Sequence, residues 1–131
     1  MEQLLELKEP IGLIKKPQDI FNKIKKINIE YEQENFLAFF LNTRNKVIQA
    51  EVLFKGGLSF CLIDIKTLFR KALKYNAFSL IVAHNHPSGN LNPSDDDLRI
   101  MEAIKKAGDI LTLKLLDFII FNKVNYYCVK D

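Results

Sequence analysis

The stretch Ser79-Leu80-Ile81-Val82-Ala83 is short and almost wholly apolar, and a polar run from His84 to Asn92 follows it directly. An apolar stretch of this length predicts a central strand that is covered on both faces. After the polar run, Asn92-Pro93 predicts the start of a helix, with Pro at the first helical position and acidic residues in the first turn. We expect that helix to end near Gly108, a residue type typical of the C-terminal cap.

The segments around this strand predict further helices and strands. A helix is expected from Pro17 to about Gln33. Asp64 can cap a second helix, whose expected inner face consists of Ile65, Leu68, Phe69, Ala72 and Leu73. Further strands are expected at residues 36–42, 47–54, 58–63, 113–121 and 126–129, the first two as a hairpin. This order predicts an α/β fold in which a mixed β-sheet is sandwiched by helices.

The composition is that of one globular domain. Of the 131 residues, 48% are apolar and 27% are charged, which excludes disordered, collagen-like and disulfide-scaffold chains. No apolar run approaches the roughly 18 residues that span a bilayer, and no signal peptide is visible. Cys61 and Cys128 lie far apart without a CxxC pattern, so both thiols are expected to be buried packing residues. We therefore expect a cytoplasmic protein that has no membrane partner.

The charge pattern argues against a nucleic-acid partner. The net charge is only +3, and the lysines between residues 15 and 26 are interspersed with acids, as on a solvated helix face. The polar run reads His-Asn-His, which suggests a nuclease, but residues 95–97 make its surroundings acidic, where such enzymes need basic and aromatic side chains. The HxE and PCxxC signatures of a zinc nucleobase deaminase are absent from the sequence.

Four polar residues form a pattern that predicts a metal site: His84, His86, Ser94 and Asp97. The two histidines point to one side if the chain stays extended, because their spacing is i, i+2. Ser94 and Asp97 share one face of the first helical turn. Asp97 continues the inward stripe of that helix, where a carboxylate must be paired. Two imidazole nitrogens and one carboxylate oxygen are the ligands of a catalytic zinc site whose fourth position is left for water.

The sequence His84-Asn85-His86-Pro87-Ser88-Gly89, followed by Ser94 and Asp97, resembles the JAMM (Jab/MPN) metalloprotease motif, and specifically its RadC-type branch. The segment Glu51-Val52-Leu53-Phe54-Lys55-Gly56 is similar to a second motif of that branch, and Leu115-Leu116-Asp117 to its closing strand. The resemblance covers residues 17–131, so we expect a RadC-like JAB/MPN domain there and an N-terminal extension at residues 1–16. It implies the JAB/MPN (cytidine-deaminase-like) architecture.

The resemblance also implies the chemistry. His84, His86 and Asp97 would bind Zn²⁺, Glu51 would hold and deprotonate the attacking water as general base, and Ser94 would donate a hydrogen bond to the developing oxyanion. The expected activity is that of a zinc-dependent metallopeptidase or isopeptidase-like hydrolase, which uses metal-activated water on an amide bond of a protein or peptide substrate. Without the resemblance, Glu51 reads as a surface charge on an edge strand.

The chain departs from the branch at positions outside the expected ligands. Phe118 stands where the branch often has His, a change expected to affect the outer shell of the site or the substrate pocket. Asp64-Ile65-Lys66-Thr67 stands where His-Pro-Arg-Glu is frequent, and Gly57 where Thr or Ser is frequent.

Two other functions are left open. One is a non-catalytic JAB-fold module that binds zinc and a partner, although relatives of that kind usually lose one or more ligands. The other is a DNA-repair-associated nucleic-acid-processing protein. Longer family members carry an N-terminal helix-hairpin-helix module associated with DNA binding, and these 131 residues show no counterpart of it.

Overall fold

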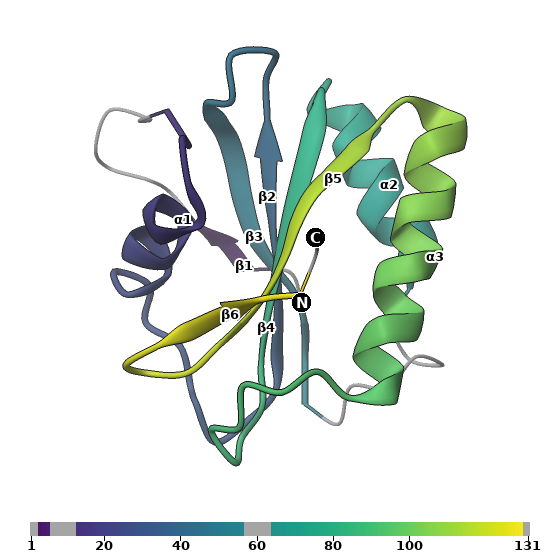
Figure 1. Cartoon of the computed structure of the whole chain (residues 1–131). Coiled ribbons are helices and arrows are strands. Elements are labelled where there is room, and N and C mark those ends of the chain that lie inside the picture. The colour runs from purple at the N-terminus through teal and green to yellow at the C-terminus, as the bar shows by residue number, and fades with distance from the viewer. Residues whose placement is uncertain (1–2, 6–12, 57–63, 130–131) are drawn as a thin grey trace.

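The computed structural model describes residues 3–5, 13–56 and 64–129. Their strands form one mixed sheet, which lies at the centre of the fold (Figure 1). The strand order is β1-β3-β2-β4-β5-β6, in which β4 and β5 are parallel and the other neighbours antiparallel. The strands are β1 (Gln3–Leu5), β2 (Asn35–Leu41), β3 (Val47–Lys55), β4 (Ser79–Asn85), β5 (Lys114–Phe121) and β6 (Tyr126–Cys128).

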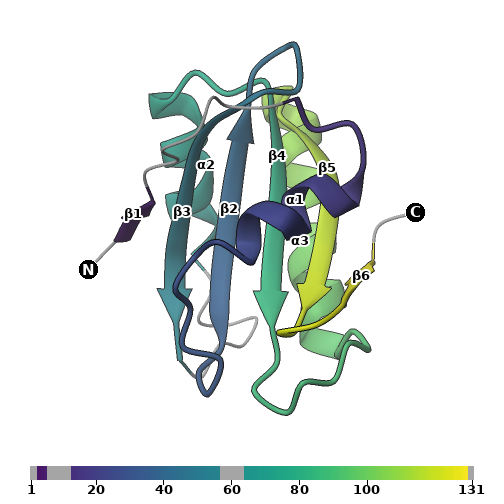
Figure 2. The same ribbon diagram turned by 90° about the vertical axis from the view of Figure 1, so that its left-hand side faces the viewer.

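Helices cover both faces of the sheet. Figure 2 shows α1 (Pro17–Ile24) crossing one face, while α2 (Ile65–Lys74) and α3 (Asp95–Leu111) lie behind the other. Each face has its own apolar cluster: α1 packs on one with Ile20 and Ile24, and α2 and α3 pack on the other with Leu68 and Ile104. The predicted α/β sandwich with a mixed sheet is therefore confirmed. No helix within the described ranges has the length and apolar character that a membrane span requires.

Most strands lie within about two residues of their predicted positions, and the β2–β3 hairpin is confirmed. Strand β4 continues beyond the predicted end at Ala83, because His84 still pairs with Phe36 of β2 and with Ile120 of β5. The predicted strand at 58–63 lies outside the described residues. Strand β1 has no counterpart among the predictions; it pairs with β3, although it falls in the predicted N-terminal extension. The division at residue 17 stays a prediction.

Helix α1 is shorter than the sequence predicts. It begins at Pro17, where the Asp19 carboxylate accepts hydrogen bonds from the backbone amides of the two lysines just before the helix (2.9 and 3.1 Å). It ends at Ile24, so the expected extent to Gln33 is wrong. Beyond that point an apolar residue recurs at every second position, and these residues pack against the same cluster as the helix: Ile27, Ile29 and Tyr31.

Helix α2 begins as predicted but faces the sheet along a different stripe. The Asp64 side chain accepts a hydrogen bond from the Thr67 amide (3.2 Å), as an N-cap does. Leu73, expected on the inner face, is 59% exposed, whereas Lys71 is only 6% exposed. The Lys71 ammonium lies inside because it pairs with the buried Glu51 carboxylate at 3.2 Å. The prediction for Leu73 is therefore wrong, while Leu68, Phe69 and Ala72 are buried as predicted.

Helix α3 begins and ends later than the sequence predicts. Ser94 is its N-cap, and its side chain accepts a backbone hydrogen bond from the first turn (3.1 Å), so Pro93 precedes the cap. At the other end, the helix continues past Gly108 to Leu111. Gly108 is needed for a close approach instead of a cap: its carbonyl accepts a hydrogen bond from the Leu113 amide (2.8 Å), and a Cβ at this position would collide with the Leu113 carbonyl oxygen.

Candidate metal centre

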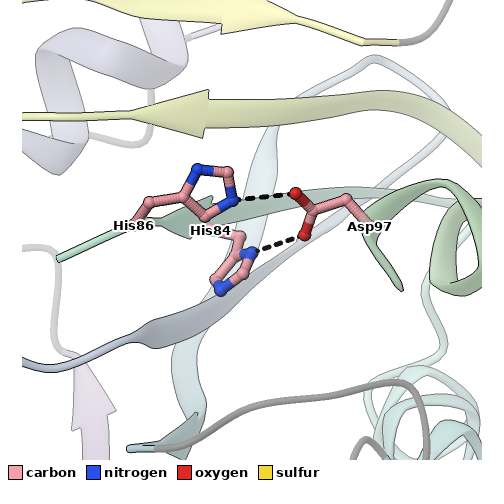
Figure 3. A group of neighbouring side chains, drawn as sticks. All are labelled: His84, His86 and Asp97. Atoms are coloured by element: carbon pink, nitrogen blue, oxygen red, sulfur yellow. Dashed lines mark hydrogen bonds and ion pairs between the residues drawn. The ribbon is translucent and has the colours of Figure 1, made fainter. Parts of the chain in front are cut away.

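Three side chains meet where β4 ends and α3 begins: His84, His86 and Asp97 (Figure 3). Nδ1 of His84 lies 2.9 Å from Oδ1 of Asp97, and Nε2 of His86 lies 2.8 Å from Oδ2. One ligand atom from each residue lies within 4.8 Å of the other two. His84 and Asp97 are buried, whereas His86 is partly exposed. The structure thus brings together all three predicted metal ligands; that they bind a metal stays a prediction.

Local geometry holds these groups in place. His84 lies on β4 two residues after Val82, so it faces the same side of the sheet, the side that α3 covers. Asp97 lies in the first turn of α3 and is fixed by a capping box: its Oδ2 accepts the Ser94 amide (2.8 Å), and its own amide donates to Ser94 Oγ (3.1 Å). The cap therefore turns the carboxylate toward β4.

A backbone contact fixes which way the His86 ring faces. Its Nδ1 lies 2.8 Å from the Asn90 carbonyl oxygen, which can only accept, so Nδ1 carries a hydrogen. Nε2 is then the nitrogen that faces Asp97 and that a metal would use. A hydrogen bond of this kind from the second ring nitrogen is the usual support of a metal-binding histidine.

The charges in the cluster support one another. Burial alone would favour neutral Asp97, but hydrogen bonds from His84, His86 and the Ser94 amide outweigh it and hold the pKa of Asp97 well below its usual range. The hydrogen bond to Asp97 raises the pKa of His86, against the opposing effect of burial. Asp97 is therefore ionised at neutral pH, as a metal ligand must be.

The composition of the cluster fits a metal ion. Two imidazole nitrogens and a carboxylate oxygen supply three protein ligands and leave a position open, the arrangement of catalytic zinc sites. Nε2 of His84 is buried and has no hydrogen-bond partner within the described part of the chain. Buried polar atoms are normally satisfied, so an orphaned nitrogen here points to a group that completes the site.

A second acidic residue, Glu34, lies beside this cluster. Its Oε1 is 3.9 Å from His84 Nε2, and its side chain is 22% exposed. Glu34 immediately precedes β2, which pairs directly with β4. The sequence analysis missed this residue because it belongs to an acidic run that includes Glu30 and Glu32. The available signal was its position directly before a strongly apolar strand.

Glu51 lies elsewhere. It is only 2% exposed on β3, where its carboxylate accepts a hydrogen bond from the Tyr75 hydroxyl and pairs with Lys71. It pairs in register with Ala38 of β2, further along the sheet than the Phe36 position that pairs with His84. The reading of Glu51 as an exposed edge charge is wrong, and it is not part of the group around Asp97. Its role as general base stays a prediction without a supporting contact.

The other predicted residues are placed as follows. Ser94 is exposed, and its hydroxyl accepts the Asp97 amide while its own hydrogen stays available to a ligand. Phe118 is fully buried in the cluster beneath α2 and α3, not at a surface. Cys128 is half-buried, and burial and the nearby Asp117 raise the pKa of its thiol to about 12. Cys61 lies outside the described residues.

A cavity of about 320 Å³ opens beside His86. The 86–89 turn forms one wall, and the turn between β5 and β6 forms another. Asn122 ties these walls together, because its Nδ2 donates to the Gly89 carbonyl oxygen (3.0 Å). Of the three residues His84, His86 and Asp97, only His86 lines this cavity, so the cavity adjoins the cluster on its His86 side.

Comparison with known proteins supports the same reading of the chain. Residues 14–131 match the family model described as the RadC-like JAB domain. A UPF0758 protein of Flavobacterium johnsoniae is 41% identical over 130 residues, which cover 99% of this chain and 55% of that protein. UPF0758 protein Lm4b_01560 of Listeria monocytogenes serotype 4b is 35% identical over 135 residues, covering 97% and 60%, respectively. UPF0758 protein CT0611 of Chlorobaculum tepidum is 33% identical over 118 residues, covering 90% and 53%. The chain thus spans roughly half to three-fifths of these relatives.

Proposed function

The chain belongs to the RadC-like JAB domain family, and from this membership and the geometry of its site we propose that it is a zinc-dependent hydrolase of amide bonds in a protein or peptide substrate. The observation that carries the proposal is the convergence of two histidines and one aspartate within 4.8 Å, beside an open cavity. Such a donor set suits zinc, which lowers the pKa of water and polarises carbonyl groups when it is bound with an open position.

The chain's own residues supply the remaining roles. Ser94 is exposed beside Asp97, where its hydroxyl can donate to an oxygen that gains negative charge during the reaction. A carboxylate must take the proton of the attacking water. We assign that role to Glu34, whose Oε1 faces His84 Nε2, in place of Glu51, whose carboxylate is held by Lys71 and Tyr75.

Metal content tests the first half of this proposal. Protein purified without added metal is compared with His86→Ala and with Ser88→Ala, a matched change in the same turn that touches none of the three ligands. We expect about one zinc per chain in the wild type and in Ser88→Ala, and little in His86→Ala, since three protein ligands are needed. Equal zinc in all three proteins, or none after reconstitution, would contradict the proposal.

Hydrolysis tests the second half. The zinc-loaded protein is offered peptide libraries and isopeptide-linked conjugates, with Glu34→Gln as the comparison. Loss of a general base lowers the rate by about 10²–10⁴-fold, while zinc content should stay at the wild-type level. Zinc binding without hydrolysis of any amide substrate would favour the non-catalytic interaction module.

A further inference from the structure

Asn85 stands between the two predicted histidine ligands in the sequence, but its side chain lies on the opposite face of the sheet. Because side chains alternate along β4, His84 faces α3, and Asn85 faces the other side with its neighbour Ala83 in the cluster under α1. Asn85 is fully buried, and so is its partner Asn35 (1% exposed). A buried amide of this kind needs satisfied hydrogen bonds, and these bonds show what it holds.

The Asn85 amide bonds to the backbone on both sides of Glu34. Its Oδ1 accepts from the Asn35 backbone amide (2.7 Å) and from Asn35 Nδ2 (3.0 Å). Its Nδ2 donates to the Gln33 carbonyl oxygen (2.9 Å). The Glu34 carbonyl oxygen in turn accepts from the Gly56 amide at the end of β3 (2.8 Å). Three consecutive backbone groups are therefore fixed around one carboxylate-bearing residue.

We propose that Asn85 is a positioning residue: its amide sets the register of the Gln33–Asn35 backbone against β4 and so holds the Glu34 carboxylate beside the metal centre. The inference rests on the proposed function, in which Glu34 is the base. One strand then controls both halves of the site. His84 on one face supplies a predicted metal ligand, and Asn85, the last residue of the strand, fixes through the other face the segment that carries the base.

The chemistry of the side chain explains why asparagine serves here. An asparagine amide offers an acceptor to the Asn35 backbone amide and a donor to the Gln33 carbonyl oxygen, which also accepts from Asn35 Nδ2 (3.0 Å). Aspartate has the same shape but offers only acceptors when ionised, so it would keep the first bond and lose the second. Alanine would lose both.

Amide exchange and paramagnetic shifts measure this role without any substrate. Nitrogen-15-labelled wild type, Asn85→Ala and Asn85→Asp are compared with Asn122→Ala, a control that also removes an asparagine bond to a loop next to the cluster. Hydrogen exchange is followed in metal-free protein. Pseudocontact shifts are then measured with Co²⁺ as the probe, at residues 33–35 and in α3.

In Asn85→Ala we expect the Asn35 amide to exchange about tenfold or more faster, the factor that the loss of one hydrogen bond produces. The Co²⁺ shifts of residues 33–35 should shrink through averaging, while those of α3 stay unchanged. The Asn85 side chain makes no hydrogen bond to His84, His86 or Asp97. Co²⁺ affinity should therefore fall by less than about tenfold, the smallest loss typical for residues that support a metal ligand. Asn122→Ala should leave residues 33–35 as in the wild type.

Asn85→Asp keeps the test valid if the alanine variant fails to fold. It should retain protection of the Asn35 amide but show averaged Co²⁺ shifts at Glu34. The Gln33 carbonyl oxygen, which belongs to the peptide group of Glu34, loses its bond from Asn85 and keeps the one from Asn35 Nδ2 (3.0 Å). Unchanged exchange and shifts in every Asn85 variant that folds would overturn the proposal, and so would a loss of Co²⁺ affinity beyond about a hundredfold. A wild type that binds no Co²⁺ would refute the proposed function, while the exchange rates would still decide the role of Asn85.

Discussion

Replacing Glu51 with Gln tests whether this glutamate is structural, as its contacts indicate, or is the general base. The change removes the charge that faces the Lys71 ammonium across 3.2 Å, where the two side chains are 2% and 8% exposed. Removing one member of a buried ion pair costs about 3–5 kcal/mol, because the other member loses the charge that offsets its burial. Domains of this size have a free energy of unfolding of about 5–15 kcal/mol. Because the unfolding entropy scales with chain length, we expect the melting temperature to fall by about 10–20 °C.

Glu34→Gln is the matched control, since it makes the same substitution at a partly exposed side chain. We expect its free energy of unfolding to stay within about 0.5 kcal/mol of the wild type. Thermal and urea unfolding of both variants, measured in metal-free protein, give the comparison. In a hydrolysis assay below the lower melting temperature, the order should reverse: Glu34→Gln loses activity, and Glu51→Gln retains it.

The opposite pattern would refute this reasoning. If Glu51→Gln unfolds at the wild-type temperature but loses hydrolysis with its zinc retained, Glu51 is the base that the family resemblance implies. The contacts of Glu51 with Lys71 and Tyr75 would then describe a resting arrangement that the substrate rearranges. A double variant, Glu51→Gln with Lys71→Met, adds a check: it should regain part of the lost stability only if the pair is structural.

Further predictions concern the metal, a helix end and a thiol. Added zinc should raise the melting temperature of the wild type and leave that of His86→Ala unchanged, because only a ligand bound to the folded state stabilises it. Gly108→Ala should lower the free energy of unfolding by about 1–3 kcal/mol through its clash with Leu113, although alanine favours helices. As a control, Ala103→Gly in the same helix should lower the free energy of unfolding by about 1 kcal/mol. A Gly108→Ala variant more stable than the wild type would disprove the clash. With the other cysteine replaced by serine, alkylation of Cys128 should be slow at pH 8 and quicken only as the pH approaches its raised pKa of about 12, whereas rapid alkylation at pH 8 would contradict that pKa.

The grouping of His84, His86 and Asp97 could be predicted because its geometry is local. An i, i+2 pair at the end of a strand and an i, i+3 pair in a first helical turn each fix their own orientation. The only long-range condition is that α3 folds back over β4, which an inward-facing Asp97 already demands. The structure brings these groups together as the spacing predicts.

The choice between Glu34 and Glu51 could not be made in this way. Each glutamate borders or interrupts an apolar run, and nothing in either run states which strand it will neighbour. Strand order decides the matter, because β2 lies between β3 and β4. A register shift between Phe36 and Leu37 then determines which β3 residues lie opposite the end of β2 near His84. Such shifts are properties of the assembled sheet.

The predictions of the end of α3 and of the inner face of α2 were wrong for a related reason. Gly108 has the residue type of a cap, but its use is settled by the return of the chain at Leu113, and this contact exists only in the folded protein. Leu73 fits the apolar period of α2, but the burial of Lys71 against Glu51 rotates the inward stripe. In both cases a tertiary contact overrode a local preference.

The short span from His84 to Asp97 has a consequence for how a metal would act on the whole chain. An ion held by these residues closes a loop of only about 15 residues, and a cross-link of that span removes unfolded-state freedom worth about 3 kcal/mol. It therefore acts as a local cross-link between the end of β4 and the start of α3 and does not join distant parts of the sheet. The segment that carries Glu34 lies outside the loop from His84 to Asp97 that the metal would close. Zinc would thus rigidify the loop that carries its own ligands. The position of the Glu34 carboxylate would depend instead on the amide of Asn85.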